Sequence, residues 1–454
     1  MTALVYVTFA VLLILCAGLQ YLALRGQNHP TIGNNPIFLK FQYIFFAAYF
    51  AALFADWLQG PYLYQLYSHY GFMESQIAII YSCGFASTVI LGTWAPILAD
   101  RFGRRKLCIL FTIIYSISCF TKLSRNYGVL IVGRVFGGMA TSLLFYTFEA
   151  WYIHEHIEGH DFPREWIPVT FTKTTVWNGA LSVLAGFIAN MISEWFHFGP
   201  VSPFMLAIPC LLISGIVVMS QWQENYGRQT IHFRKSCMDG IREILADERI
   251  FFIGAIQASF ESVMYIFIFI WTPVLKVDKP PLGIIFSCFM VCIMIGAAIF
   301  QLVRARKISV VTTLSLAICC ASAAMITCVF ATGGSGGRKL SFFAFLLLEI
   351  GVGIYFPSMG FIRMKVIPEQ HRASITSWFR VPLNLIACAV LTMLHGTSGH
   401  YGNRMIFMMC AGLLAIAMMC LLRFGRYGLF LHLESSRSPV LLHRLSTSLP
   451  PGMS

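Results

Sequence analysis

Six ionisable side chains interrupt long apolar stretches of this 454-residue sequence. They are Asp56, Arg134, Glu149, Glu261, Glu349 and Arg380. A charged group in hydrocarbon is costly, so such residues usually pair with one another, relay protons or bind a solute. The four carboxylates could take up protons, and the two guanidinium groups could bind an anion through several N–H donors. A set of buried ion pairs that holds helices together is the alternative.

Two polar stripes accompany these charges. The first stripe comprises Tyr49, Asp56, Gln59 and Tyr67, and the second comprises Gln257, Glu261 and Tyr265. Both spacings place their members on one face of a regular helix. Leu63 interrupts the first stripe with an apolar side chain. Pro61 follows Asp56 and Pro357 follows Glu349, so both helices could loosen and free backbone carbonyls near a site. A kink without function is the alternative for each proline.

The composition requires that these residues be positioned by membrane-spanning helices. The chain is 57% hydrophobic and only 11% charged, with a mean hydropathy of +0.73, which excludes a soluble enzyme, a disordered chain and a secreted disulfide module. Apolar runs of about 20 residues span a bilayer as helices, so an all-α polytopic membrane protein is expected. The thirteen predicted spans are 3–24, 40–66, 76–99, 107–122, 128–150, 172–194, 203–221, 250–271, 283–302, 310–331, 340–361, 374–394 and 403–423.

Basic residues divide unevenly between alternate connections. If residues 25–40 are cytoplasmic, 23 of the 32 Lys and Arg lie on that side and seven on the other, with only Arg134 and Arg380 inside helices. The positive-inside rule then predicts an external N-terminus and a cytoplasmic C-terminus. The net charge of +13 is therefore assigned to topology, and no nucleic-acid partner is expected.

The spacing of the spans predicts the domain organisation. We expect a leading helix (1–24), a six-helix bundle (40–221), a cytoplasmic linker (222–249), a second six-helix bundle (250–423) and a disordered cytoplasmic tail (424–454). The leading stretch has no basic residue before Arg25 and is longer than a signal-peptide core, so it is interpreted as a retained helix.

No motif indicates a cofactor, a metal or an enzyme. The 14 cysteines lie almost entirely in apolar runs without a Cys-x-x-Cys pair, which is typical of buried thiols. The run from His154 to Asp161 contains three histidines but lacks the His-Glu-x-x-His spacing; a polar helix end is favoured over a metal-sensing loop. Phosphate-loop and nucleophile-elbow motifs are absent from the sequence.

The connection Ala99-Asp100-Arg101-Phe102-Gly103-Arg104-Arg105 resembles the signature between helices 2 and 3 of the major facilitator superfamily. The resemblance implies a 6+6 arrangement of inverted three-helix repeats after one additional leading helix. It also implies that Asp100, Arg101, Gly103 and Arg104 act in gating, through a charge cluster that stabilises one gating state, and do not touch the substrate. Pro96 departs from the pattern, which usually has Gly there. Gly133, Arg134, Gly137 and Gly138 resemble a second, shorter motif of the superfamily.

Longer runs are similar to one family within that superfamily. They include Asp56-Trp57-Leu58-Gln59-Gly60-Pro61-Tyr62, Phe148-Glu149-Ala150-Trp151-Tyr152, Tyr355-Phe356-Pro357-Ser358-Met359 and Trp378-Phe379-Arg380-Val381-Pro382. These runs resemble the eukaryotic molybdate-anion transporter family over about residues 36–425. The resemblance implies a multi-pass protein of the cell membrane that imports molybdate.

The resemblance and the charges together give a hypothesis for the site. Arg134 and Arg380, with Gln59 and Gln257, are predicted to bind molybdate or a related oxyanion. Asp56, Glu149, Glu261 and Glu349 are predicted to include ion-pair partners and a proton-coupling group. The excess of carboxylates leaves two alternatives open, which are a transporter of a cation or small organic solute and a receptor with a transporter fold.

Overall fold

The computed structural model describes residues 1–25, 35–227, 233–276, 280–331, 334–368, 371–393 and 400–437. The backbone in these ranges is almost entirely helical and contains no strand. The all-α prediction is therefore confirmed.

Eight α-helices, including the leading helix, precede the linker in the described part of the chain. They are α1 (Thr2–Arg25), α2 (Pro36–Gln59), α3 (Leu63–His69), α4 (Glu74–Phe102), α5 (Arg104–Thr121), α6 (Tyr127–His154), α7 (Ile167–Asn190) and α8 (Ser202–Gln221), with α1 the leading helix. The linker and the rest of the chain form α9 (Phe233–Ala246), α10 (Glu248–Leu275), α11 (Leu282–Ala305), α12 (Val310–Ala331), α13 (Gly334–Val366), α14 (Arg372–Thr392) and α15 (His400–Arg437).

Local capping explains where several helices begin. The side-chain oxygen of Asn35 accepts hydrogen bonds from the backbone N–H groups of Ile37, at 3.0 Å, and Phe38. Asn126 caps α6 in the same way by accepting from Gly128 N–H at 2.9 Å. Pro36 is the first residue of α2, where a missing N–H costs nothing.

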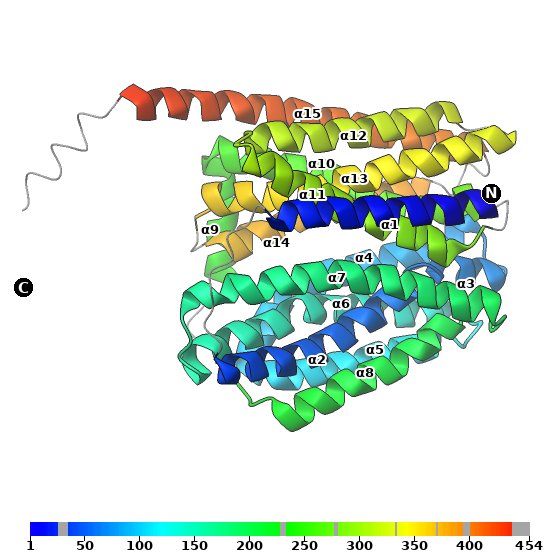
Figure 1. Cartoon of the computed structure of the whole chain (residues 1–454), viewed down its shortest axis with the longest axis horizontal. Helices are drawn as coiled ribbons and strands as arrows, with labels where there is room; N and C mark the ends of the chain where they lie inside the picture. Colours follow the sequence, from blue (N-terminus) through cyan, green and yellow to red (C-terminus); the bar gives the residue numbers. More distant parts are fainter. Residues whose placement is uncertain are drawn as a thin grey trace, which may run out of the picture.

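The helices form two bundles that lie one above the other in Figure 1. In the lower bundle, α2 packs on α7 and α8, and α6 packs on α4 and α5. In the upper bundle, α13 packs on α11 and α12, and α15 packs on α10 and α12. The bundles meet where α4 contacts α14 and where α7 contacts α11, while α1 packs on α11 beside this seam.

Twelve helices in the described part of the chain are long and apolar enough to cross a membrane. The thirteenth expected span, α5, packs on α6 and α8 within the bundle but begins with three consecutive charged residues, Arg104, Arg105 and Lys106. With three charges in 18 residues, α5 is less apolar than these twelve helices, and it is shorter than its neighbours α4 and α6.

Most helices differ from their predicted bounds by a few residues, and three of the differences bear on the interpretation. The expected span 40–66 divides into α2 and α3 at Gly60, beside Pro61, whereas α13 runs through Pro357 without the loosening considered there. The helix α13 continues to Val366, five residues past its predicted end. The helix α15 continues to Arg437, so the first part of the tail predicted to be disordered is helical, and residues 438–454 lie outside the described residues. Apolar residues continue past 423 at helical spacing, which the basic residues there obscured.

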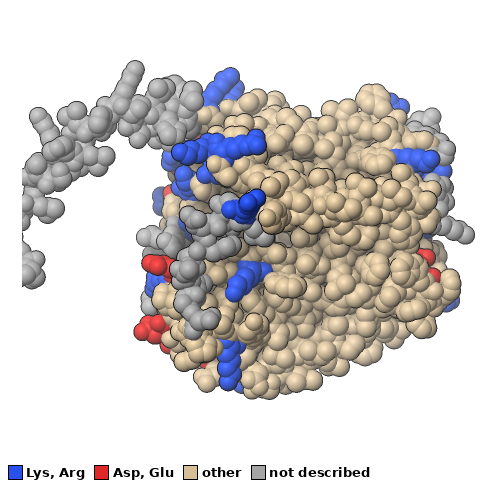
Figure 2. Space-filling view, in the orientation of Figure 1, with Lys and Arg blue, Asp and Glu red and all other residues tan. Residues whose placement is uncertain are grey.

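The two ends of the molecule differ in charge. We call them the α9 end, which also carries the turn between α4 and α5, and the α3 end. Figure 2 shows most of the visible Lys and Arg side chains at the α9 end and few at the α3 end. The middle of this face carries almost no charge, as expected for a surface in contact with lipid.

Candidate functional site

The charged residues of the first bundle are held by tyrosines and not by one another. Asp56 accepts a short hydrogen bond from the Tyr115 hydroxyl group of α5. The Tyr49 hydroxyl group lies 3.5 Å from the Glu149 carboxylate and donates to it. None of the ion pairs among the described residues includes any of the six intramembrane charges. The alternative of ion pairs that hold the helices together therefore finds no support within these ranges.

A polar cluster in the second bundle joins α10 and α13. The Tyr355 hydroxyl group donates to Glu261 at 3.2 Å, and the Arg363 guanidinium group donates to the side-chain oxygen of Gln257 at 3.3 Å. Glu261 also lies within electrostatic range of Arg363 and Arg380. The structure therefore brings together three of the predicted residues, Gln257, Glu261 and Arg380.

Arg363 belongs to this cluster, and sequence analysis missed it. The predicted helix ended at residue 361, so Arg363 was assigned to a cytoplasmic connection. The spacing contained the missing information, because Tyr355 and Arg363 are eight residues apart and share one face of a continued helix.

Arg380 lies where the two bundles meet. It belongs to α14, and a Cβ atom at Gly92 of α4 would be 3.5 Å from its guanidinium nitrogen and 3.7 Å from the Ser142 hydroxyl oxygen of α6. Arg380 therefore reaches across the seam to the first bundle, where glycine leaves room for it. Its side chain is exposed although it lies mid-helix, which indicates a solvated space between the bundles.

Arg134 lies at a different depth from Arg380. Its guanidinium group packs against Gly84 of α4 and over the ring of Tyr81, with its central carbon 5.2 Å from the ring centre. Gly84 and Gly92 are eight residues apart, or about 12 Å along a helix. The structure thus does not bring the two predicted anion-binding arginines to one point.

Two further predicted residues lie apart from both groups. Glu349 is buried, within electrostatic range of Cys292 of α11 and on the side of the upper bundle that α1 covers. Gln59 is also buried, and its amide nitrogen donates to the carbonyl group of Ala55 in the same helix at 3.1 Å. Neither side chain faces Arg380 in this conformation, and their predicted roles remain predictions.

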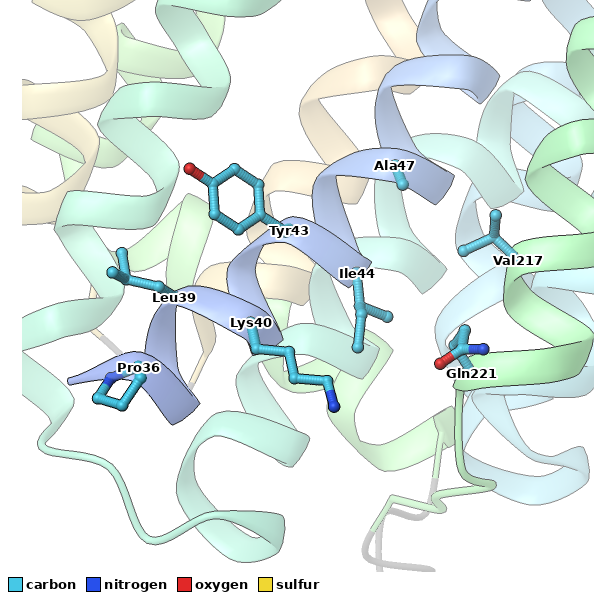
Figure 3. Close-up of a pocket in the computed structure, with 8 residues that line it drawn as sticks. All are labelled: Pro36, Leu39, Lys40, Tyr43, Ile44, Ala47, Val217 and Gln221. Carbon is cyan, nitrogen blue, oxygen red and sulfur yellow. The ribbon is translucent and has the colours of Figure 1, made fainter.

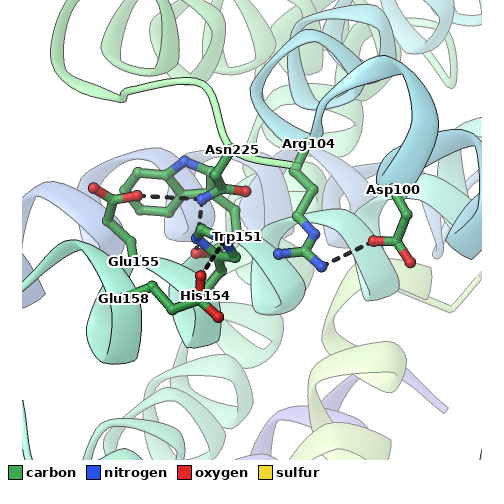
Figure 4. Close-up of polar contacts among 7 residues, drawn as sticks. All are labelled: Asp100, Arg104, Trp151, His154, Glu155, Glu158 and Asn225. Carbon is green, nitrogen blue, oxygen red and sulfur yellow. Dashed lines mark hydrogen bonds and ion pairs between the residues drawn. The ribbon is translucent and has the colours of Figure 1, made fainter. Parts of the chain in front are cut away.

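The motif between α4 and α5 forms a compact polar junction (Figure 4). Asp100 and Arg104 make an ion pair of 2.8 Å across the turn, while Gly103 has φ +102°, a conformation that favours glycine. Glu224, which follows α8, accepts hydrogen bonds from the backbone N–H groups of Arg105 and Lys106 at 2.9 and 3.2 Å. The carboxylate therefore caps the N-terminus of α5.

We expect substitution Glu224→Ala to lower the free energy of unfolding by about 1–2 kcal/mol, because it removes both acceptors from the helix N-terminus. Thermal unfolding of the purified protein in detergent measures this change. Gln223→Ala is the matched control, since that neighbouring side chain is exposed. Equal losses in the two variants would contradict the capping role.

The histidine-rich segment is engaged with the polypeptide itself. His156 is fully buried and lies 2.9 Å from the carbonyl oxygen of Pro163, and His154 pairs with Glu158 at 3.3 Å (Figure 4). The described residues contain no group of three or more His, Cys, Asp or Glu side chains arranged to hold a metal ion. The segment is a structured helix end, but Glu155 and His156 are buried in it, unlike the solvated helix end that the sequence favoured.

A groove of about 570 Å³ lies outside the bundle between α2 and α8 (Figure 3). Its walls are almost wholly apolar, with Lys40 and Gln221 near one end. Because these side chains face away from the seam, the groove is separate from the polar groups around Arg380.

Comparisons with known proteins agree on one kind of molecule. A family model described as sugar transporters with 12 transmembrane helices matches residues 4–350. The chain is 48% identical to the molybdate-anion transporter of Xenopus tropicalis, over 91% of this chain and 93% of that protein. It is 45% identical to the molybdate-anion transporter of Takifugu rubripes, over 94% and 96% of the two chains.

Solved structures support the same fold. A D-xylose-proton symporter matches with a TM-score of 0.67 at 11% identity, covering 85% of this chain and 97% of that one. A peptide transporter in complex with sulfate matches with a TM-score of 0.66 at 15% identity, covering 90% and 99%. At these identities the likeness concerns the fold alone.

Proposed function

Because this chain belongs to the molybdate-anion transporter family of the major facilitator superfamily, and is a transporter and not an enzyme, we propose that it imports molybdate into the cytoplasm. The curated relatives that carry this name match nearly the whole chain. The observation that supports an anion as substrate is Arg380, an exposed guanidinium group at the seam between the bundles.

The proposed route uses alternating access. Two contacts between the bundles lie toward the α3 end: Cys388 of α14 approaches the Ser82 carbonyl group of α4, and the Ser287 hydroxyl group of α11 donates to the Val183 carbonyl group of α7 at 2.8 Å. This conformation is closed at the α3 end. In this proposal the basic α9 end is cytoplasmic, following the positive-inside rule, and a conformation closed at the α3 end is then inward-facing.

The site proposed for the bound anion in this state centres on Arg380. A guanidinium group offers several directed donors to a tetrahedral dianion; the nearby Ser142 hydroxyl group donates to backbone carbonyl groups in this conformation. The charge next to this site would depend on Glu261, a carboxylate within electrostatic range of both Arg363 and Arg380. Arg363 is held in place by its hydrogen bond to Gln257. Proton uptake by Glu261 would reduce its repulsion of the anion, which supports coupling to an inward proton gradient.

Uptake into proteoliposomes tests this proposal. We expect saturable molybdate entry that an inward proton gradient stimulates and that excess sulfate reduces, because both anions are tetrahedral dianions. Protein-free liposomes are the control. Entry without gradient dependence would reject coupling alone, and absence of entry from well-folded protein would reject the molybdate assignment.

A further inference from the structure

Lys122 is a buried cation that the transport route described above does not use. It follows the last residue of α5 at the α3 end, yet its side chain is 1% exposed. A lysine at the end of a membrane helix ordinarily extends to the aqueous interface. Lys122 instead turns inward, and its ammonium nitrogen has no hydrogen-bond partner among the described residues.

The surrounding contacts fix this inward position. The hydroxyl group of Tyr70 donates to the backbone carbonyl group of Lys122 at 2.5 Å. The hydroxyl group of Ser118, one turn earlier in α5, donates to the Gly133 carbonyl group of α6 at 2.6 Å. A Cβ atom at Gly133 would lie 3.2 Å from the Lys122 nitrogen, so the ammonium group reaches the residue that directly precedes Arg134.

Two cations and an unpaired hydroxyl group therefore converge on one region. The Lys122 nitrogen lies 5.9 Å from the ring centre of Tyr67, and the Tyr67 hydroxyl group is fully buried without a partner. The Nε atom of Arg134 is a third buried polar atom without a partner. Unpaired buried donors are costly, and three of them in adjacent side chains indicate that a ligand completes the site.

The charge balance identifies the class of ligand. Arg134 has Asp56 within electrostatic range, and Lys122 lies within range of Arg134, so two cations face one carboxylate. The ion pairs of the described residues leave Lys122 without a carboxylate. Burial and the neighbouring Arg134 lower the pKa of Lys122 to about 7. An anion would relieve both the repulsion and the missing hydrogen bonds.

We propose that Lys122, Arg134 and Tyr67 form a second anion-binding site at the α3 end, which accepts small inorganic anions, including tetrahedral oxyanions. This site is separate from Arg380: Gly84, which Arg134 contacts, and Gly92, which Arg380 contacts, are about 12 Å apart along α4. This inference rests on the proposed function only for the identity of the transported anion. In a transporter, the site would receive the anion from the external side before the anion reaches Arg380.

Binding to the purified protein tests the site without requiring transport. Molybdate, sulfate and chloride are titrated separately, with thermal stabilisation and calorimetry as the readouts. For each anion that binds to the wild-type protein at this site, we expect Lys122→Met to weaken binding by about tenfold or more. Arg125→Met is the matched control, because Arg125 is an exposed cation three residues away. Unchanged affinity in Lys122→Met would overturn the proposal.

A second variant and the pH profile separate binding from folding. Tyr67→Phe removes a hydroxyl group that has no hydrogen-bond partner among the described residues, so weaker anion binding by a stable variant would support the site.

Between pH 7 and 8.5 the empty site loses the Lys122 proton, and anion binding must restore it, so affinity should fall by up to about tenfold per pH unit. In Lys122→Arg this dependence should disappear, because guanidinium stays charged. A pH profile identical to that of the wild type would count against Lys122.

The neighbouring titratable groups leave Lys122 as the expected source of this dependence. The groups that face it are Arg134 of α6, Cys119 of α5 and Tyr67 of α3, with Tyr70 at its backbone. If molybdate is the anion that binds through Lys122, the site is occupied by the proposed transported solute. If chloride binds and molybdate does not, the site is occupied by an inorganic ion of the surrounding solution. Lys122-dependent binding without molybdate uptake would reject the proposed function and retain this site; the reverse result would reject this site alone.

Discussion

Substitution of Arg380 by alanine should reduce molybdate uptake by about 10- to 100-fold. Arg380 is an exposed cation at the seam of the two bundles, and a charge-assisted hydrogen bond contributes about 1.5–3 kcal/mol. Arg380→Lys should restore part of the activity, because lysine keeps the charge and loses the planar set of donors. Initial rates of uptake at several molybdate concentrations measure the effect on KM and on maximal rate.

The control for this prediction is Arg306→Ala. Arg306 is an exposed arginine directly after α11 at the α9 end, so its loss changes the net charge equally and leaves the seam intact. Uptake by Arg380→Ala equal to that of the control, at equal protein content, would reject the assignment of Arg380 to the anion site.

Substitution Gly283→Val should open the α3 end and reduce uptake. A Cβ atom at Gly283 of α11 would overlap the Gly186 carbonyl oxygen of α7 and lie 2.6 Å from the Cβ atom of Asn190. Overlap with backbone cannot be relieved by rotating a side chain, so the closed state should lose about 1–3 kcal/mol. Such a loss changes the ratio of closed to open molecules by roughly 5- to 150-fold.

A natural cysteine reports this change. Cys388 of α14 faces the Ser82 carbonyl group of α4 at 3.8 Å, so it lies in the contact that must separate when the α3 end opens. Maleimide modification of the Cys388 peptide, followed by mass spectrometry, should accelerate in Gly283→Val. Gly412→Val is the control, since its Cβ atom would meet nothing within 4 Å. Equal modification rates in both variants would refute the closure assigned to this contact.

The sequence by itself determined the fold class and the family. Apolar runs of bilayer length can only be helices in lipid, and the turn from Asp100 to Arg105 carries a recognisable motif. The Gly60–Pro61 break between α2 and α3 was also predictable, because proline has a defined effect on a helix. These are local properties, so neighbouring residues in the chain suffice to predict them.

Only the tertiary structure decided the partners of the charged residues. Asp56 accepts a hydrogen bond from Tyr115, and Glu149 accepts one from Tyr49; each tyrosine lies on a different helix from its carboxylate. The sequence had suggested ion pairs between carboxylates and arginines as one alternative. Lys122 ends the predicted span 107–122, where a lysine ordinarily extends to water, yet it is buried. Hydropathy is a property of a segment, whereas the direction of a side chain depends on the helix that packs against it. That packing places Arg380 at the seam and Arg134 beside Lys122, and local sequence carries no information about either distance.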